Sequence, residues 1–392
     1  MKLHRFGPTV ALAMAATLTL TACGDDDPTD DPADNGAEED PEDAGEETES
    51  EDAGADTGGE DGGSMELSGQ ISASGASSQN SAMTAWIAGY QEVQPEVTIN
   101  YDAIGSGGGR ENLASGASPL VGSDAYLDEE EREGVIEVCG DGGALHVPGY
   151  ISPIAIAYNL PGVEELNLAP DVLAQIFNQD IETWDDPAIA EDNPDAELPD
   201  TEITVVNRSD ESGTTENFLE YLTAVAPDAW PHEVSGDWPV SGGEAAAQTT
   251  GVIQVVQGTE GAITYSDASA IGSLSTAAIG VGEEFVDYSP EAAAAVVEAS
   301  EPADTGIEGD LALDLARDTT ETGTYPIVLV SYEIACSSYE DENTANIVKD
   351  FLTYVVSEEG QQVAAEAAGS APISDGLRER AMETIEIIEG GS

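Results

Sequence analysis

Apolar positions recur with two different spacings along most of the chain. In residues 81–91 the apolar side chains recur at helical spacing, which predicts a helix. Residues 97–101 alternate between apolar and polar positions, which predicts a strand. Residues 150–158 form a continuous apolar run, which is typical of a strand buried within a sheet. The chain therefore contains both element types in close succession.

The same two patterns continue to the C-terminal end. Strands are predicted at residues 65–71, 203–206 and 327–332, helices at 215–225, 344–356 and around Asn112, a turn at 105–109, and a further apolar segment at 172–177. Strands that alternate with helices predict an α/β fold with largely parallel sheets. We find no internal repeat.

The first residues have the pattern of an export signal. Lys2 and Arg5 precede an apolar run at residues 10–20 that is too short to span a bilayer as a mature helix. The following Leu-Thr-Ala-Cys23 resembles the lipobox of bacterial lipoproteins, in which the cysteine is lipidated and becomes the mature N-terminus. We expect residues 1–23 to be a lipoprotein signal peptide ending at Cys23. The alternative is an ordinary cleaved signal with an incidental cysteine.

An acidic segment follows the signal. Residues 24–64 hold 19 acidic and no basic side chains, and none of them could anchor a core. We expect residues 24–66 to form a disordered linker, extended by its like charges, that tethers a folded domain to the membrane.

The whole chain of 392 residues has 9 basic and 80 acidic side chains and a net charge of −71. Residues 65–392 alone hold 61 acidic and seven basic side chains, a net charge of −54. This charge excludes a nucleic-acid partner, because neutralising phosphates requires a basic surface, and it excludes adsorption to an anionic membrane through the folded surface. We interpret this charge as halophilic adaptation to a salty exterior; the alternative is a merely soluble acidic protein.

The segment at residues 208–215 carries candidate binding chemistry. It lies between a predicted strand and a predicted helix, so Ser212 is placed to cap the helix and Gly213 lets the backbone approach a ligand closely. The first N–H groups of a helix form an anion site, and Arg208 can add a planar fork of donors. The alternative is a helix cap with no ligand.

Two further junctions between a strand and a helix have a similar composition. Residues 104–110 contain a glycine run that could present several backbone donors, but they match neither a Walker loop nor a dinucleotide-binding fingerprint. Residues 75–78 add two hydroxyl groups. Each could be a simple turn, but together the three junctions could surround a small tetrahedral anion.

The motifs also occur in an order that resembles a known family, the phosphate-binding protein of the bacterial phosphate ABC transporter (PstS). The motifs in order are Gly75-Ala-Ser-Ser78, Ile104-Gly-Ser-Gly-Gly-Gly109, Gly122-Ser-Asp-Ala-Tyr-Leu127, Tyr158-Asn-Leu-Pro-Gly162, Thr183-Trp-Asp-Asp186 and Arg208-Ser-Asp-Glu-Ser-Gly-Thr214. The resemblance covers residues 67–270 closely and the C-terminal third loosely.

The resemblance implies a two-lobed periplasmic-binding-protein fold of type II, with the ligand in the cleft between the lobes. Lobe I would comprise residues 67–157 and 325–392, and lobe II residues 158–324. The chain would be a monomeric, lipid-anchored protein on the outer face of the cell membrane. It would capture inorganic phosphate and deliver it to the permease subunits of an ABC transporter, without a cofactor, a metal or catalysis.

The resemblance also implies the ligand contacts, residue by residue. The phosphate-binding positions would be Ser77, Ser78, Ser106, Asp124, Arg208, Ser212, Gly213 and Thr214, and Asp210 would steady Arg208 without touching the ligand. The family often has Thr-Phe-Pro where this chain has Ser77-Ser78-Gln79, so Ser78 would contribute its backbone N–H without the wall that a phenylalanine ring provides.

A single carboxylate among anion-binding donors has a chemical explanation. Phosphate keeps at least one proton near neutral pH, and an ionised Asp124 can accept it in a charge-assisted hydrogen bond. Sulfate has no such proton and would face an unpaired acceptor of like charge, so Asp124 would select phosphate by penalising the competitor.

Other functions are less compatible with these residues. A serine hydrolase would need an activated serine, but Ser106 and Ser212 lie outside any G-x-S-x-G motif, and His146 and His232 are expected to be surface or packing residues. A binder of sulfate or molybdate is disfavoured by Asp124. A surface adhesion or structural protein would fit the acidic tether but not the three anion-type loops.

The chain has three cysteines, too few for a disulfide-rich scaffold or a typical cysteine metal site. Once Cys23 is lipidated, Cys139 and Cys336 remain, and in an oxidising exterior we expect them to form a bridge that closes a long loop. The alternative is two buried free thiols.

Overall fold

The computed structural model describes residues 66–391. The predicted signal peptide, the lipidation site at Cys23 and nearly all of the predicted acidic linker lie outside the described residues. Among residues 66–391, no helix has the length and apolar character needed to cross a membrane.

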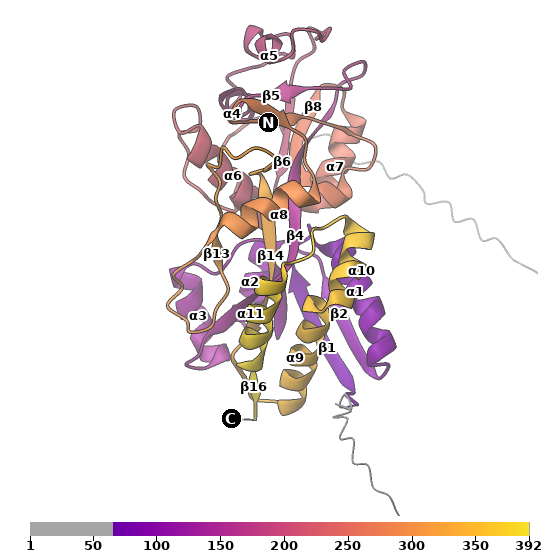
Figure 1. Ribbon diagram of the computed structural model, residues 1–392, viewed down its shortest axis with the longest axis vertical. Helices are drawn as coiled ribbons and strands as arrows, with labels where there is room; N and C mark the ends of the chain where they lie inside the picture. The colour runs from indigo at the N-terminus through magenta and orange to yellow at the C-terminus, as the bar shows by residue number, and fades with distance from the viewer. Residues whose placement is uncertain (1–65, 392) are drawn as a thin grey trace, which may run out of the picture. The chain divides into compact units, whose positions relative to one another are not determined.

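A mixed sheet forms the centre of this part of the chain (Figure 1). Within the described residues its nine strands are β1 (Gly69–Gly75), β2 (Val97–Asp102), β3 (Leu120–Ser123), β4 (Ala144–Asn159), β6 (Thr204–Arg208), β7 (Glu244–Ala246), β8 (Ala262–Asp267), β9 (Ser275–Thr276) and β14 (Val328–Cys336). The order across the sheet is β2-β1-β3-β14-β4-β8-β6-β7, and β9 pairs with β4 beside this path.

The directions of these strands correct the prediction of largely parallel sheets. The outer strands are parallel to their neighbours, as in the pairs β1 with β2 and β6 with β8. The central strands are antiparallel, because β14 runs opposite to both β3 and β4, and β4 runs opposite to β8. A continuous apolar run fits a buried strand of either direction, so the sequence pattern could not decide this point.

The long strand β4 joins the two ends of the sheet. Its first part pairs with β14 over residues 144–153, and its last part pairs with β8 over residues 154–159. All of its residues except the last are buried, and every residue of β14 is buried. The predicted boundary between the lobes, after residue 157, falls within β4, and the division into lobes stays a prediction.

Short strands form three small additional sheets among the described residues. These strands are β5 (Asn167–Leu168), β10 (Ala278–Val281) and β11 (Glu284–Val286) in one sheet, β12 (Glu301–Pro302) and β13 (Leu313–Asp314) in the second, and β15 (Ser338–Tyr339) and β16 (Glu389–Gly390) in the third.

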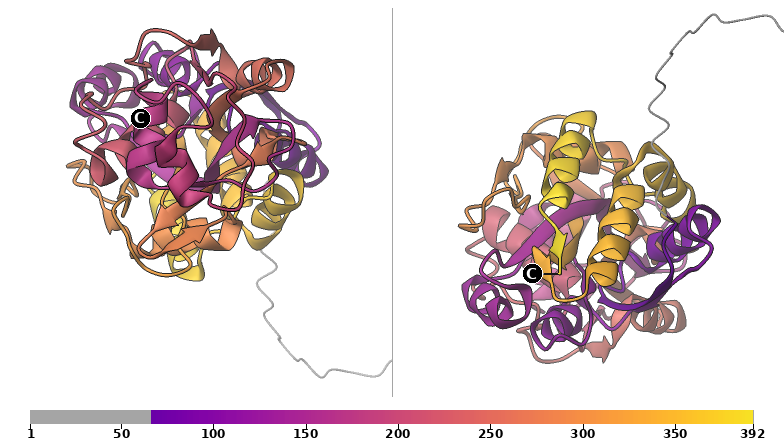
Figure 2. Two further views of the ribbon diagram at one scale, coloured as in Figure 1. Left: turned by 90° about the horizontal axis from the view of Figure 1, so that it is seen from above. Right: turned by 90° about the horizontal axis from the view of Figure 1, so that it is seen from below.

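Helices follow most strands and complete an α/β fold, as predicted. Their bounds are α1 (Asn80–Val93), α2 (Ser106–Ala114), α3 (Glu129–Cys139), α4 (Pro170–Phe177), α5 (Pro187–Asp192), α6 (Gly213–Val225), α7 (Gln248–Gly258), α8 (Pro290–Ala299), α9 (Glu342–Val356), α10 (Glu358–Ala368) and α11 (Asp375–Glu386), with a 3₁₀ turn η1 (Ala268–Ala270). Helices α1, α9, α10 and α11 pack together, and of these α1 contacts β2, α9 contacts β1 and β4, and α11 contacts β4 (Figures 1 and 2).

The core explains the helical spacing of residues 81–91. Helix α1 buries Met83, Trp86 and Tyr90 on one face, and the Trp86 indole N–H donates to the carbonyl of Gly360 in α10 (2.8 Å). A buried indole needs such a partner, since an unpaired donor in the core is costly.

Two local predictions need correction. The predicted strand at 65–71 is β1, but β1 runs from Gly69 to Gly75. The predicted turn at 105–109 is largely the first part of helix α2, which begins at Ser106. Glycine disfavours a helix interior, so the glycine run resembled a turn. In the structure the run is helical, and its missing side chains leave room for other segments, since a Cβ on Gly109 would lie 2.6 Å from Gly75 Cα.

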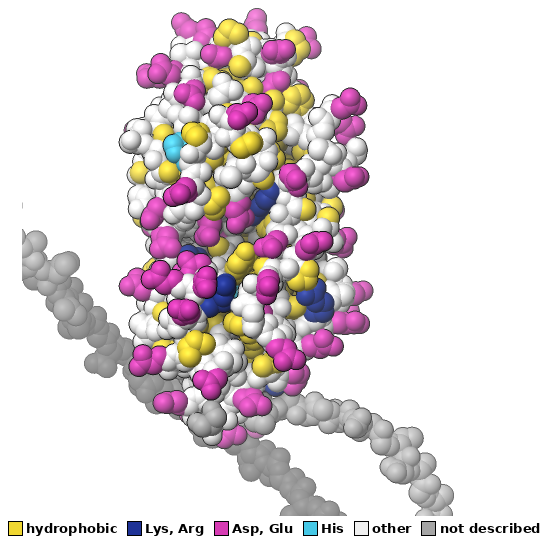
Figure 3. Space-filling view, turned by 90° about the vertical axis from the view of Figure 1, so that its left-hand side faces the viewer, with side chains coloured by type: hydrophobic (Ala, Val, Ile, Leu, Met, Phe, Trp, Pro, Cys, Tyr) yellow, Lys and Arg dark blue, Asp and Glu magenta, His cyan; other side chains and the backbone are white. Residues whose placement is uncertain are grey.

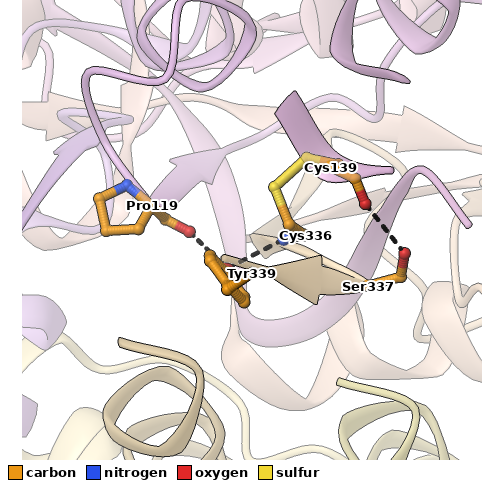
Figure 4. Close-up of a disulfide and its surroundings, with 5 residues drawn as sticks. All are labelled: Pro119, Cys139, Cys336, Ser337 and Tyr339. Carbon is orange, nitrogen blue, oxygen red and sulfur yellow. Dashed lines mark hydrogen bonds between the residues drawn. A yellow bond between two sulfur atoms is a disulfide. The ribbon is translucent and has the colours of Figure 1, made fainter. Parts of the chain in front are cut away.

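Cys139 and Cys336 form a disulfide that joins the end of α3 to the end of β14, with Cα atoms 4.6 Å apart (Figure 4). Nearby hydrogen bonds hold both ends of the bridge, and at Cys139 the Ser337 hydroxyl donates to the backbone carbonyl (3.3 Å). The Tyr339 hydroxyl accepts from the backbone N–H of Cys336 (3.0 Å) and donates to the carbonyl of Pro119 (2.6 Å). The bridge therefore closes a loop of 197 residues around most of the described fold.

Candidate functional site

The carboxylate of Asp124 is the meeting point of segments from distant parts of the chain. Asp124 directly follows β3 and is only 3 % exposed. Its Oδ1 accepts hydrogen bonds from the hydroxyls of Ser78 (2.7 Å) and Ser331 (2.6 Å), and its Oδ2 accepts one from Thr214 (2.9 Å). A buried carboxylate surrounded by hydroxyl donors has its charge compensated locally.

Two glycine-containing loops approach Asp124 from opposite ends of the sheet. The Asp124 backbone N–H donates to Ser106 Oγ at the start of α2 (3.1 Å). Gly213, at the start of α6, packs against Ser106 and Asp124. A Cβ on Gly213 would be 2.7 Å from both Ser106 Oγ and Asp124 Cβ. Only glycine permits this approach, so the loops at residues 104–110 and 208–215 meet at Asp124.

Arg208 supplies the positive charge of the candidate site. It is 5 % exposed and forms a two-pronged pair with Asp210, with Nε–Oδ1 at 2.8 Å and Nη2–Oδ2 at 2.5 Å. Burial alone would raise the pKa of Asp210, but hydrogen bonding and the charge of Arg208 hold it below its usual value. A Cβ on Gly105 would be 3.5 Å from Arg208 Nη2, so the guanidinium lies beside the start of α2.

Helix N-termini add backbone donors. Helix α2 begins at Ser106, and helix α6 begins at Gly213 with Ser212 as its cap, whose Oγ accepts from the N–H of Thr215 (3.3 Å). The first N–H groups of a helix have no carbonyl partner within it, and the helix dipole places positive potential there. Ser106, Ser212, Gly213 and Thr214 are all buried beside these two ends.

Ser77 lies at the site but its hydroxyl is engaged elsewhere. Ser77 Oγ is hydrogen-bonded to the Thr249 hydroxyl (3.0 Å) and accepts from the Thr249 N–H at the start of α7 (3.1 Å). The neighbouring Gln248 N–H donates to Asp210 Oδ1 (3.0 Å). The β7–α7 junction is thus a fourth strand-to-helix junction at the site, and the sequence analysis missed it.

Two more residues at Asp124 were missed. Ser331, on β14, donates to the carboxylate, and Asn217, one turn into α6, donates to the Asp124 carbonyl (2.7 Å). Ser331 had a signal in the sequence, since it is a polar residue inside the apolar run at 327–332. Asn217 had none, because an amide in the first turns of a helix is common.

A cavity of about 320 Å³ has Asp124 in its lining. Its lining includes the carboxylates of Glu216, Glu220 and Asp314 and the guanidinium of Arg317. Burial raises the pKa of Glu216 to about 7. Asp124 is the one predicted ligand residue in this lining, so the cavity adjoins the predicted cradle but is chemically different from it.

His146 and His232 have partners outside the site. The His146 ring is fully buried; its Nε2 accepts from the Leu127 N–H (3.0 Å) and its Nδ1 pairs with Asp310 (2.9 Å). His232 Nε2 is hydrogen-bonded to Asn178 (2.8 Å). His146 is therefore a packing residue, as expected.

Comparison with known proteins decides the family. Residues 48–359 match the family model of the PBP superfamily domain. The chain is 33 % identical over 399 residues to the phosphate-binding protein PstS 3 of Mycobacterium tuberculosis. That alignment covers 99 % of this chain and 100 % of the relative. It is 32 % identical to the phosphate-binding protein PstS of Methanocaldococcus jannaschii, over 81 % of this chain and 86 % of the relative.

The chain belongs to the PstS family. This confirms the resemblance found in the sequence. The fold agrees as well, because a solved phosphate-binding protein from Stenotrophomonas maltophilia superposes with a TM-score of 0.60 at 19 % identity, over 81 % of this chain and 94 % of that one.

Within the PstS family, the departure of this chain at residues 77–79 has a local structural consequence. The Ser78 hydroxyl donates to both oxygens of Asp124, at 2.7 and 2.8 Å. Whatever wall a phenylalanine would provide at this position, Ser78 here is a donor to the central carboxylate.

Proposed function

We propose that this PstS-family protein captures inorganic phosphate in the cradle around Asp124 and delivers it to an ABC-type phosphate permease. The observation that carries the proposal is a nearly buried carboxylate surrounded by anion-binding donors, namely hydroxyls, two helix N-termini and Arg208. Relatives named as phosphate-binding proteins support the same ligand.

The chemistry of phosphate explains why a carboxylate belongs there. Ser78 and Thr214 can turn their hydroxyls from Asp124 towards a bound anion, which frees the carboxylate to accept the proton that phosphate carries. Ser331 continues to donate to Oδ1 and holds the carboxylate in place. Sulfate offers no proton, so its binding would leave two negative groups in contact in a dehydrated site.

The proposed ligand set keeps the residues predicted from the sequence. It comprises Ser77, Ser78, Ser106, Asp124, Arg208, Ser212, Gly213 and Thr214. Ser77 contributes through its backbone N–H, since its hydroxyl is bonded to Thr249. Asp210 orients Arg208 by accepting a hydrogen bond from its Nε.

The proposed location is the outer face of the cell membrane. The lipobox-like Leu-Thr-Ala-Cys23 and the acidic linker support a lipid anchor and a tether that holds the monomeric binding domain away from the bilayer. Two lobes, residues 67–157 with 325–392 and residues 158–324, would close around the ligand.

Catalysis is not part of the proposal. The family supplies substrate-binding components of transporters, and the protein releases phosphate unchanged to the permease. A different oxyanion, such as sulfate or molybdate, is the alternative that the following test distinguishes.

The test is competition between labelled phosphate and sulfate at fixed ionic strength. The wild-type protein should retain phosphate in a large excess of sulfate. Asp124→Asn removes the negative charge and adds an N–H donor. This variant should still bind phosphate through Arg208 and the backbone donors, but more weakly, and its preference for phosphate over sulfate should be smaller than that of the wild type. Asp228→Asn, at an exposed position, is the matched control and should behave like the wild type.

Effective competition by sulfate against the wild-type protein would overturn both the role of Asp124 and the phosphate assignment. An unchanged preference in Asp124→Asn would remove Asp124 from the selectivity mechanism while leaving phosphate as the ligand.

A further inference from the structure

Arg110 ends the glycine run of α2 and is almost completely buried, at 6 % exposed. Its Nε contacts Glu131 Oε1 of α3 at 2.7 Å, and its Nη1 donates to Ser123 Oγ at 3.1 Å. Its Nη2 contacts Glu211 Oε1 at 2.9 Å and lies 3.9 Å from Glu216 Oε2. One guanidinium therefore joins the β3 and α3 region to the loop that contains Arg208.

Glu211 reaches Arg110 because glycines make room for it. A Cβ on Gly107 would lie 2.3 Å from Glu211 Cδ, and a Cβ on Gly236 would lie 2.9 Å from Glu211 Cγ. The Glu211 side chain thus passes directly over the helical glycine run. Gly107 therefore has a structural role that is separate from presenting backbone donors to an anion.

The charge balance at Arg110 favours this contact. Burial alone would lower the pKa of Arg110, but the carboxylates of Glu131, Glu216 and Glu211 more than offset that effect and raise it. Glu211 remains 49 % exposed, so its side of the pair is open to screening by salt.

The position of the pair matters because both of its loops carry proposed ligand groups. Ser106 lies four residues before Arg110, and Arg208 and Ser212 lie on either side of Glu211. The first loop follows β2, an edge strand at one end of the sheet, and the second follows β6 near the other end. An ion pair between these two loops can therefore restrict their separation.

We propose that the Arg110–Glu211 ion pair is a latch that holds the two ligand loops together over bound phosphate and slows its release. Neither residue is a ligand. They act by positioning the loops that carry Ser106, Arg208 and Ser212. The proposal rests on the proposed function, because it takes phosphate as the anion.

The sign of the expected effect separates a latch from simple electrostatics. Removing a negative charge near an anion site should by itself speed phosphate association and tighten binding. Loss of a latch should instead speed dissociation. Glu211→Gln therefore gives opposite predictions under the two explanations. It leaves Glu131 in place as a partner for Arg110.

The experiment measures phosphate association and dissociation rates by stopped-flow fluorescence on the full chain. Glu211→Gln should raise the dissociation rate roughly two- to fivefold, as expected for a partly exposed ion pair. Gly107→Ala displaces the Glu211 side chain without changing the charge and should have a similar effect, and the double variant should add little to either single variant. The difference from the wild type should shrink at molar salt.

Glu220→Gln is the matched control. Glu220 lies on α6 outside the two ligand loops, is 40 % exposed, and pairs with Arg317 at 2.9 Å. Loss of this ion pair should leave the phosphate dissociation rate within about twofold of the wild type. An unchanged or slower dissociation in Glu211→Gln, with phosphate still bound by the wild type, would overturn the latch alone. Failure of the wild-type protein to bind phosphate would overturn the proposed function and the latch with it.

Discussion

Asp124 brings a negative charge into a site whose other groups are hydrogen-bond donors. Its oxygens are bonded to the hydroxyls of Ser78, Thr214 and Ser331, which come from three separate segments. A hydroxyl can either donate or accept, so these side chains adapt to the charge that faces them. All three hydroxyls compensate the charge of Asp124, and those of Ser78 and Thr214 can also turn to donate to an anion beside it.

Arg208 is the residue at which a loss of affinity is easiest to predict. Arg208→Ala removes a charge-assisted pair, so phosphate affinity should fall roughly ten- to hundredfold in calorimetric titration. Arg208→Lys should restore only part of it, because the planar fork is lost. Arg378→Ala is a suitable control, since Arg378 pairs with Asp375 on the surface of α11. Equal affinity of wild type and Arg208→Ala would place Arg208 outside the site.

Glu333 is a fully buried carboxyl on β14, and neither of its oxygens has a hydrogen-bond partner within the described residues. Burial, aided by the charge of Asp124, raises its pKa from 4.5 to about 8. A carboxyl that is more basic in the folded state binds its proton more tightly there, so the free energy of unfolding falls as the pH rises from 4.5 to about 8.

Glu333→Gln should therefore weaken the pH dependence of stability in that interval. Thermal unfolding midpoints measured at several pH values should fall less steeply for Glu333→Gln than for the wild type. Some slope remains, because burial also raises the pKa of Asp267 to about 6 and of Glu216 to about 7. Glu389→Gln, on the exposed strand β16, should follow the wild-type curve. Parallel curves for all three proteins would show that Glu333 titrates normally.

At the scale of elements, four strand-to-helix junctions build the cradle. Those after β1, β2, β6 and β7 meet near Asp124, and the hydrogen bonds of Ser77 to Thr249 and of Gln248 to Asp210 connect them. The carboxyl ends of strands in an α/β sheet are where ligands bind, because helix N-termini gather there. The disulfide ties α3 and β14 together at the far end of β14.

The disulfide should stabilise the fold by restricting the unfolded chain. Its loop of 197 residues gives an entropic upper limit of about 5 kcal/mol. Reducing agent should lower the thermal unfolding midpoint of the wild type. The variant Cys139→Ala/Cys336→Ala should unfold at a lower temperature than the wild type and should not respond to reducing agent. Equal midpoints for the oxidised and reduced wild type would contradict this contribution.

At the scale of the molecule, the surface is strongly acidic. Figure 3 shows acidic side chains spread over the whole of one face, with few lysine or arginine side chains among them. Three of the seven basic side chains of residues 65–392, Arg110, Arg208 and Arg317, are buried in ion pairs. The acidic side chains Asp124, Asp267 and Glu333 are buried as well, so the remaining surface keeps the large excess of acidic over basic side chains.

This charge predicts stability that depends on salt. Repulsion among closely spaced carboxylates is unscreened at low ionic strength, so the thermal unfolding midpoint should rise as NaCl or KCl increases towards molar concentrations. Matched titrations with both salts would separate screening, which is common to both, from binding of one cation. A midpoint that does not change with salt would contradict adaptation to a salty exterior and leave the fold unaffected.

The sequence by itself determined what depends on local spacing. The helical face of α1, the buried run of β4 and the cap at Ser212 follow from residues close together in the chain, and the ordered motifs identified the family. Only the tertiary structure decided the antiparallel pairing of β4 with β14, the approach of Ser331 to Asp124 and the contact of Arg110 with Glu211. Those features join residues up to 207 positions apart. Which distant segments meet depends on how the whole chain folds, and the local spacing of side chains does not determine that.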